Sequence, residues 1–276
     1  MTAHELMIKT NHYLIKGGSL TNSQKENIVR QLLVARSDVR AKKSFYKSMN
    51  YQNNTDKNGN IVGTYPAFYI PPYNDNKKLQ TVIPMSPKTH ILASNAYELD
   101  IIRILHLFAP EHPDVKDMVE KTFKRLENSC PGGDCCQGEC FHSSLPVLRF
   151  FIIAKPNDTA WIKRLMIKIN KHIEDKQKCN GGSVGYYWLF LSELPLEIAE
   201  PELLKYKDDM VARLNKSAIM NNEKDKVNNP VLFCVIRNCL SRLPEYEYIK
   251  DRQPYVSDKD GRLYFDIKPL DSAVGE

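Results

Sequence analysis

The hydrophobic positions after Lys88 alternate between two kinds of segment. Four segments are apolar on almost every side, at residues 97–108, 145–154, 184–194 and 231–243. They end at or just before prolines that are 46, 39 and 49 residues apart, namely Pro110, Pro156, Pro195 and Pro244. Each of the first three is followed by an amphipathic segment with apolar residues at helical spacing, at residues 115–126, 161–173 and 203–214. The pattern predicts a helix-pair repeat.

This alternation predicts an all-α fold of repeated helical hairpins in two layers. A helix that is apolar on all sides has to be enclosed by protein, whereas an amphipathic helix keeps one face in water. Enclosed helices that alternate with half-exposed ones are typical of an α/α-barrel or toroid. The alternative is an open HEAT-like solenoid, which leaves more of both helices of each pair amphipathic.

The remaining segments are organised around this repeat as parts of one predicted domain, residues 1–276. Residues 1–49 predict a helical hairpin that turns at Gly17 and Gly18 and resumes behind a cap at Thr21, Asn22 or Ser23. Residues 50–88 are rich in proline and tyrosine and predict an irregular excursion that packs its aromatic side chains. After the helix pairs of residues 89–244, the tail 245–276 predicts a small β-hairpin centred on a turn at Asp258–Gly261.

Composition and charge exclude several classes of protein. The 276 residues are 42% hydrophobic and 26% charged, as in a globular protein rather than a disordered one. The net charge of +6 is mild and scattered along the chain, which argues against nucleic acid as a partner. Because no signal-peptide pattern or membrane span is found, we expect a cytoplasmic protein. Its seven cysteines are then expected to be thiols or metal ligands rather than disulfides.

The segments that lead into the four apolar helices contain most of the unusual residues. If these helices run in one direction, the segments lie at one end of the fold, where a rigid scaffold can hold a functional site. The second segment contains four cysteines and a histidine, and the third begins with Cys179. Thiolates and imidazoles are ligands that zinc prefers. We therefore predict a zinc site with ligands from Cys130, Cys135, Cys136, Cys140, His142 and Cys179.

Other interpretations of the cysteines remain open. Their spacing differs from the paired C-x2-C of zinc ribbons and from that of iron–sulfur proteins. A redox or nucleophilic thiol is one alternative, and cysteines that act only as small apolar residues in a tight loop are another. If zinc keeps an open position, Glu139 or Asp134 would serve as general base for metal-bound water, and otherwise as an outer group that orients the ligands.

A few further residues are candidates for binding or acid–base chemistry. His90 is a candidate acid or base, and Tyr97, Glu98, Tyr186 and Trp188 are candidates to line a pocket for an apolar ligand. A structural hydrogen bond or core packing is the competing interpretation for each of them. Arg149 is the only charge within its apolar segment and requires a carboxylate partner, for which Glu98, Asp100 and Glu193 are candidates.

The helical pattern is similar in architecture to the α/α-toroids of terpene cyclases and protein prenyltransferases, but the chain lacks their aspartate-rich motifs, and architecture alone does not carry function. The hypothesis for function is an enzyme that acts on a small apolar or amphipathic molecule. The alternative is a non-catalytic helical-repeat scaffold that binds a protein or peptide.

Overall fold

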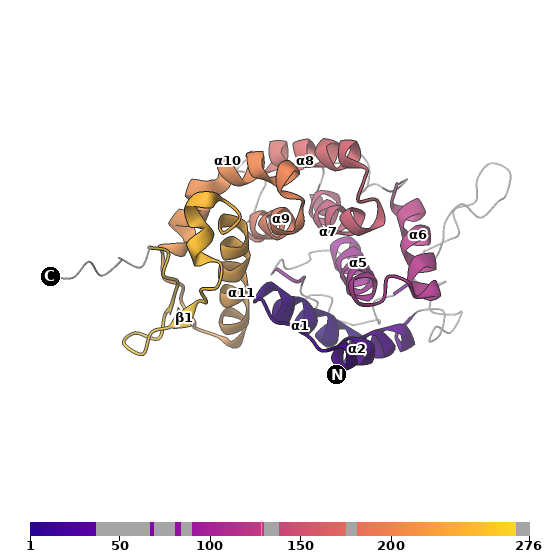
Figure 1. Cartoon of the computed structure of the whole chain (residues 1–276), viewed down its shortest axis with the longest axis horizontal. Helices are drawn as coiled ribbons and strands as arrows, with labels where there is room; N and C mark the ends of the chain where they lie inside the picture. The colour runs from indigo at the N-terminus through magenta and orange to yellow at the C-terminus, as the bar shows by residue number, and fades with distance from the viewer. Residues whose placement is uncertain are drawn as a thin grey trace. The chain divides into compact units, whose positions relative to one another are not determined.

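The computed structural model describes residues 1–36, 67–68, 81–83, 90–127, 129, 138–174 and 181–268. Within these ranges, the side chains of residues 90–94, 138–140, 181–183 and 224 are also outside the described part. The described chain is predominantly helical, with a small two-stranded antiparallel sheet (Figure 1). The predicted helical class and the C-terminal hairpin are confirmed to that extent. None of the described helices is long and apolar enough to cross a membrane.

The chain forms two compact units. The first contains residues 1–11 and 19–179, and the second contains residues 12–18 and 180–276, so that helix α1 (Ala3–Ile15) contributes to both. The sequence-based division into one helical-repeat domain stays a prediction, and each unit is described in turn.

The N-terminal hairpin follows the predicted signals. After α1, Gly17 adopts a positive φ of 89°, which glycine accepts without steric cost. Helix α2 (Asn22–Val34) then begins with a capping box, in which the Thr21 side chain accepts from Gln24 N and Gln24 Oε1 accepts from Thr21 N. The hairpin predicted over residues 1–49 is described as far as Arg36, and α2 ends at Val34 with Ala35 as its cap. Residues 37–49 lie outside the described residues.

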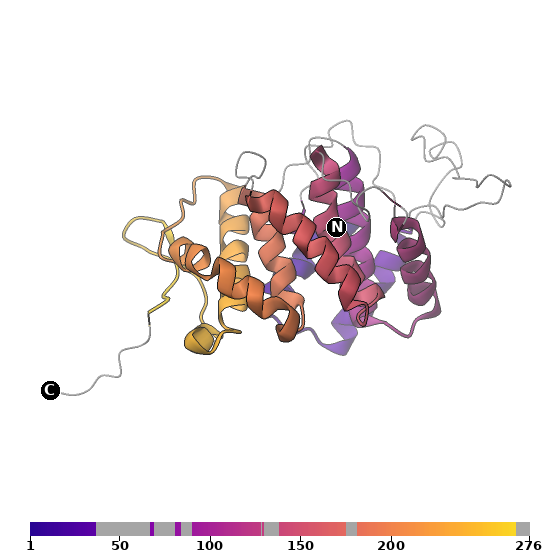
Figure 2. The same ribbon diagram turned by 90° about the horizontal axis from the view of Figure 1, so that it is seen from above.

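In the first unit, two buried helices pack side by side, α5 (His90–Phe108) and α7 (Gly138–Ala154) (Figures 1 and 2). Helices α2 and α6 (Pro113–Glu127) pack on α5, and α8 (Thr159–Glu174) packs on α7. Phe68, from the proline- and tyrosine-rich excursion, is 1% exposed, as predicted for an aromatic residue that packs. Tyr65, Tyr69 and Tyr73 lie outside the described residues.

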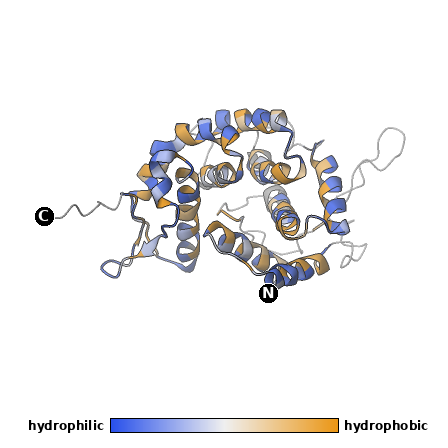
Figure 3. Ribbon diagram, viewed as in Figure 1, coloured by the Kyte–Doolittle hydropathy of each residue, from blue (hydrophilic) through white to orange (hydrophobic). Residues whose placement is uncertain are grey.

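Burial separates the two kinds of helix as the hydrophobic pattern predicts. Every residue from Ser143 to Phe151 of α7 is buried, whereas α6 buries one stripe, formed by Val115, Met118, Thr122 and Leu126. Hydrophilic residues accordingly recur along α6 and α8 in Figure 3. Burying a large apolar side chain contributes roughly 1.5–3 kcal/mol. The enclosed helices therefore supply much of the stability of the unit.

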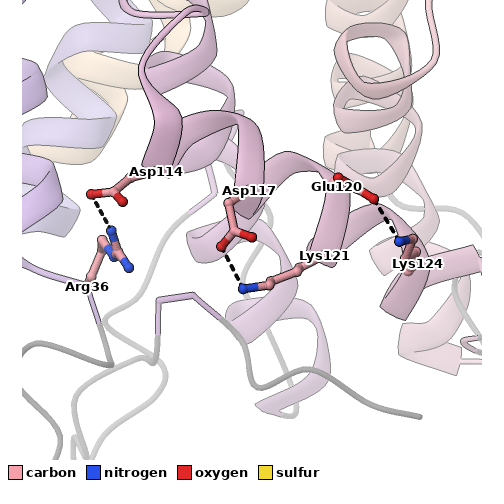
Figure 4. A network of polar contacts seen from close by, with 6 residues as sticks. All are labelled: Arg36, Asp114, Asp117, Glu120, Lys121 and Lys124. Atoms are coloured by element: carbon pink, nitrogen blue, oxygen red, sulfur yellow. Dashed lines mark hydrogen bonds and ion pairs between the residues drawn. The ribbon is translucent and has the colours of Figure 1, made fainter.

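The exposed face of α6 carries paired charges. Asp117 with Lys121 and Glu120 with Lys124 form i,i+4 ion pairs, each 2.7 Å long (Figure 4). At the start of the helix, Asp114 accepts from Arg36, just beyond the end of α2, also at 2.7 Å. The last of these contacts joins α2 to α6, whereas the first two lie within one helix.

In the second unit, α9 (Gly181–Glu193) packs against α11 (Glu223–Leu240), and α10 (Leu196–Leu214) packs against both. The end of α1 is fixed here, because Arg237 Nη2 and Asn238 Nδ2 of α11 both donate to the Ile15 carbonyl, at 3.2 and 2.9 Å. A 3₁₀ helix, η2 (Pro244–Ile249), follows and contacts α11.

The C-terminal hairpin pairs β1 (Tyr255–Val256) with β2 (Leu263–Tyr264), with Tyr255 opposite Tyr264. Asp258–Gly261 forms the predicted turn. Gly261 has a φ of 66°, and Asp260 accepts from Arg262 N at 3.0 Å and from the Tyr264 hydroxyl at 2.6 Å. Its carboxylate oxygens are therefore used within the hairpin.

The buried helices begin earlier than their apolar runs. The predicted fourth loop, around Pro230, lies inside α11, whose start at Glu223 is capped by Asn222 as its side chain accepts from Asp225 N at 2.9 Å. Pro146 is likewise inside α7. A cap and good helix formers upstream outweigh the missing N–H of one proline. Residues of the predicted loops, including His90 and His142, are therefore helical.

Candidate functional site

Most of the predicted metal and acid–base residues cannot be placed by their side chains. Among the predicted ligands, His142 alone has a described side chain. Outside the described residues or side chains lie Cys130, Cys135, Cys136, Cys140, Cys179, Asp134, Glu139 and His90. The backbones of Cys140 and Glu139 lie in the first turn of α7, and that of His90 lies at the start of α5. In the part of the chain that the structure describes, no group of three or more His, Cys, Asp or Glu side chains is arranged to hold a metal.

The described neighbour of the cysteine-rich segment is an aromatic contact between α7 and α8. Phe141, which is fully buried, stacks on His172 with ring centroids 3.7 Å apart and planes 24° apart. Its other contact is with His142, whose ring meets it edge-on at 5.3 Å. Two imidazoles thus lie against one phenyl ring, directly after Cys140 in the sequence. His172 was not among the predicted ligands, and the signal in the sequence is its position in the last turn of α8, shortly before Cys179.

Glu98 is a structural carboxylate of the first unit. It lies in α5 with 2% of its side chain exposed, pairs with Arg125 of α6 and accepts from Ala67 N at 2.6 Å. A buried carboxylate that faces a guanidinium and a backbone N–H has its charge balanced locally. Glu98 therefore fixes α6 and the excursion to α5, which favours its structural interpretation over a role in binding substrate.

Arg149 of α7 pairs with one of its three predicted carboxylate partners. Its Nη1 donates to Asp100 Oδ1 of α5 at 2.7 Å, and the exposed fractions of the two side chains are 0% and 1%. Neither Glu98 nor Glu193 is the partner in this contact. The ion pair is an internal link between the two buried helices of the first unit.

Some buried polar atoms of the first unit have no hydrogen-bond partner among the residues that the structure describes. Ser143 Oγ, next to His142 on α7, is fully buried and unsatisfied, and so is Arg125 Nε, although that guanidinium pairs with Glu98 through Nη2. Such atoms are uncommon in folded proteins, and they concentrate where water, ions or ligands bind. Ser143 Oγ and Arg125 Nε are therefore polar atoms in the interior of the unit.

The predicted aromatic pocket residues are divided between the units. Tyr97 is 5% exposed and its ring lies 6.2 Å from that of His4, in the first unit. Tyr186 and Trp188, which are 0% and 7% exposed, belong to α9 of the second unit. Trp188 Nε1 is buried and has no acceptor among the described residues. All three aromatic residues are therefore in cores, and Trp188 alone leaves a polar atom unsatisfied.

The two described cysteines are structural. Cys239 Sγ lies 3.1 Å from the Trp188 carbonyl, and complete burial strongly raises the pKa of this thiol. Burial also raises the pKa of Cys234, although Arg237 opposes the shift. A thiol with a raised pKa is a poor nucleophile and a poor metal ligand. We therefore do not expect Cys234 and Cys239 to bind metal, unlike the cysteines of the segment 130–140.

A scan of protein-family models, a search of curated proteins and a search of solved structures found no match to this chain. The function is therefore inferred from the residues of the chain itself.

Proposed function

We propose that the protein binds zinc through the cysteine-rich segment, with ligands drawn from Cys130, Cys135, Cys136, Cys140, His142 and Cys179. The observation that carries the proposal is the density of soft donors, since four of the seven cysteines lie within residues 130–140 and His142 follows directly. Zinc sites in proteins use such cysteine and histidine sets. The cysteine ligands act as thiolates, which a reducing compartment preserves. We therefore propose a cytoplasmic location as well.

The described contacts support this site in two ways. His142 belongs to a helix that is enclosed from Ser143 onward, so that at least one ligand would be held on a rigid element. His172 is a further candidate ligand, because its ring and the ring of His142 both contact the ring of Phe141. Asp134 and Glu139 would orient the ligands or, beside an open coordination position, take a proton from metal-bound water.

Elemental analysis of protein purified without a metal-binding tag tests the proposal. We expect about one zinc per chain, and less zinc together with a lower melting temperature in Cys135→Ser, Cys140→Ser and His142→Ala, because metal binding is coupled to folding. Cys234→Ser is the matched control and should retain its zinc, since that thiol is buried in the second unit. Metal-free wild-type protein whose three variants melt like it would refute the site.

We infer, as a second candidate function, that a small amphipathic molecule binds beside Trp188. A buried indole N–H without an acceptor is a cost to the folded protein, which a ligand with an apolar body and one acceptor atom would remove. Tyr186 lies on the same helix and is also buried, so that it would add to the apolar lining of such a binding site. This interpretation supports an enzyme or a binding protein for small molecules over a scaffold for proteins or peptides.

Tryptophan fluorescence tests this second function. The chain has two tryptophans, so that Trp161→Phe leaves Trp188 as the only reporter. We expect a saturable change in its emission with sodium decanoate, and no saturable change with the more polar acetate. Equal responses to both, or none, would favour the alternative of a scaffold that binds a protein or peptide. The α/α-toroid arrangement, with the open solenoid as its alternative, stays a prediction that the alternation of buried and amphipathic helices supports.

A further inference from the structure

One face of α8 carries a cluster of cations that the sequence analysis regarded as scattered charge. The helix buries Ile162, Leu165, Met166, Ile169 and Ile173 on one side. Lys163, Arg164 and Lys171 are exposed on the other side, and Lys168 is half-buried. These residues follow one another at helical spacing, so that they form a stripe about 12 Å long from Lys163 to Lys171. We call the three exposed cations, Lys163, Arg164 and Lys171, the basic stripe.

The basic stripe is not neutralised by its own helix. No acidic residue occurs between Asp158 and Glu174, and within one helical turn only Lys171 has a carboxylate neighbour, Glu174. Asp158 is occupied at the start of α8, where it accepts from Trp161 N at 3.1 Å. On α6, by contrast, Lys121 and Lys124 lie 2.7 Å from carboxylates on the same helix. Exposed cations without carboxylates at helical spacing produce a local positive potential.

An apolar side chain lies in the middle of the stripe. Ile167 is 70% exposed, which is the largest value among the exposed large hydrophobic residues of the described chain. Its helical position falls between those of Lys163 and Lys171. A nucleic acid would use the cations but would gain little from an isoleucine, and this face offers no exposed aromatic ring for base stacking. An anionic lipid surface uses both, because phosphates attract the cations while the apolar side chain enters the boundary with the acyl chains.

We propose that the exposed face of α8, formed by Lys163, Arg164, Ile167, Lys168 and Lys171, docks on an anionic lipid bilayer surface. The contact is peripheral: α8 keeps its apolar face in the protein core and lies along the membrane plane. Each cation near such a surface strengthens partition by about fivefold. The three exposed cations and one isoleucine therefore give a reversible, salt-sensitive association with membranes that are rich in acidic lipids.

Sedimentation with large unilamellar vesicles tests the proposal on the 276-residue chain. We expect binding to vesicles of phosphatidylcholine with 30% phosphatidylserine, weak binding to pure phosphatidylcholine, and release as sodium chloride is raised. Neutralising three exposed cations in Lys163→Gln/Arg164→Gln/Lys171→Gln should weaken partition roughly 100-fold. The matched control, Lys116→Gln/Lys121→Gln/Lys124→Gln on α6, removes the same charge and should stay within about threefold of the wild type, because those lysines are paired with carboxylates.

A second variant separates the lipid surface from other polyanions. Ile167→Gln should lower vesicle partition several-fold and leave the melting temperature unchanged, because the side chain is mostly in water. The same proteins are titrated with a fluorescent single-stranded RNA. Binding to RNA without binding to acidic vesicles would overturn the proposal, as would equal losses in the α8 and α6 triple variants, or vesicle binding that Ile167→Gln does not change.

Discussion

Arg149 and Asp100 form an ion pair in which both side chains are buried, and the pair joins the two buried helices of the first unit. The Nη1–Oδ1 distance is 2.7 Å, and the exposed fractions of the side chains are 0% and 1%. Loss of either partner would leave the other charge buried without its counter-ion, which is far more costly than loss of a surface pair. The pair also fixes the register between α5 and α7.

Arg149→Met is therefore expected to lower the free energy of unfolding by roughly 3–5 kcal/mol. Replacing both members, in Arg149→Met/Asp100→Leu, should recover at least half of that loss, because no isolated charge remains. Urea denaturation followed by circular dichroism measures both values. Lys124→Met on α6 is the control: its partner Glu120 is exposed, and its unfolding midpoint should not move. A double variant no more stable than Arg149→Met would contradict the paired-charge account.

The buried thiols of the second unit should resist alkylation. Burial raises the pKa of Cys239 strongly and that of Cys234 as well, so that little thiolate is present at pH 8. We expect iodoacetamide to leave both residues unmodified in the folded protein and to label both in urea, as measured by peptide mass spectrometry. Rapid labelling of Cys239 under native conditions would show that α11 opens far more readily than its burial indicates.

Stability should depend on pH through His106. Burial, assisted by Arg103, lowers the pKa of this imidazole below its ordinary value of 6.5. The unfolded chain therefore binds the proton more readily than the folded one, and stability falls as pH drops from about 6.5 toward the lowered pKa. Melting temperatures between pH 7.5 and 5 should decrease less in His106→Gln than in the wild type. If the melting temperatures of the two proteins change with pH in parallel, His106 is not the cause of the pH dependence of stability.

The sequence predicted the helix types well because burial is encoded in periodicity. The continuous apolar run around Arg149 predicted an enclosed helix and a carboxylate partner, and Asp100 was among the three candidates. The starts of the helices were harder to predict, since Pro230 was assigned to a loop but lies inside α11, and α7 begins at Gly138, before its apolar run at 145–154. Single-residue signals mislead where an upstream cap, such as Asn222, starts the helix earlier.

The site was less accessible to prediction than the fold, because it depends on contacts between separate elements. Periodicity placed His172 on α8 but did not indicate that its ring stacks on Phe141 of α7. The basic stripe was overlooked because the net charge of the whole chain does not show that several cations lie on one face of one helix. In contrast, the cysteine-rich segment was apparent from composition alone, and its chemistry is the central claim.

Titration of reduced, metal-free protein with cobalt(II) tests that claim most directly, because cobalt bound by thiolates gives an intense ultraviolet charge-transfer absorption that oxygen and nitrogen ligands do not. We predict that this absorption rises to saturation at about one equivalent per chain and is displaced by zinc. It should be largely lost in Cys135→Ser/Cys140→Ser and retained in Cys234→Ser, whose thiol is buried in the second unit. A wild-type titration without thiolate absorption, or the same absorption in the double variant, would contradict the account.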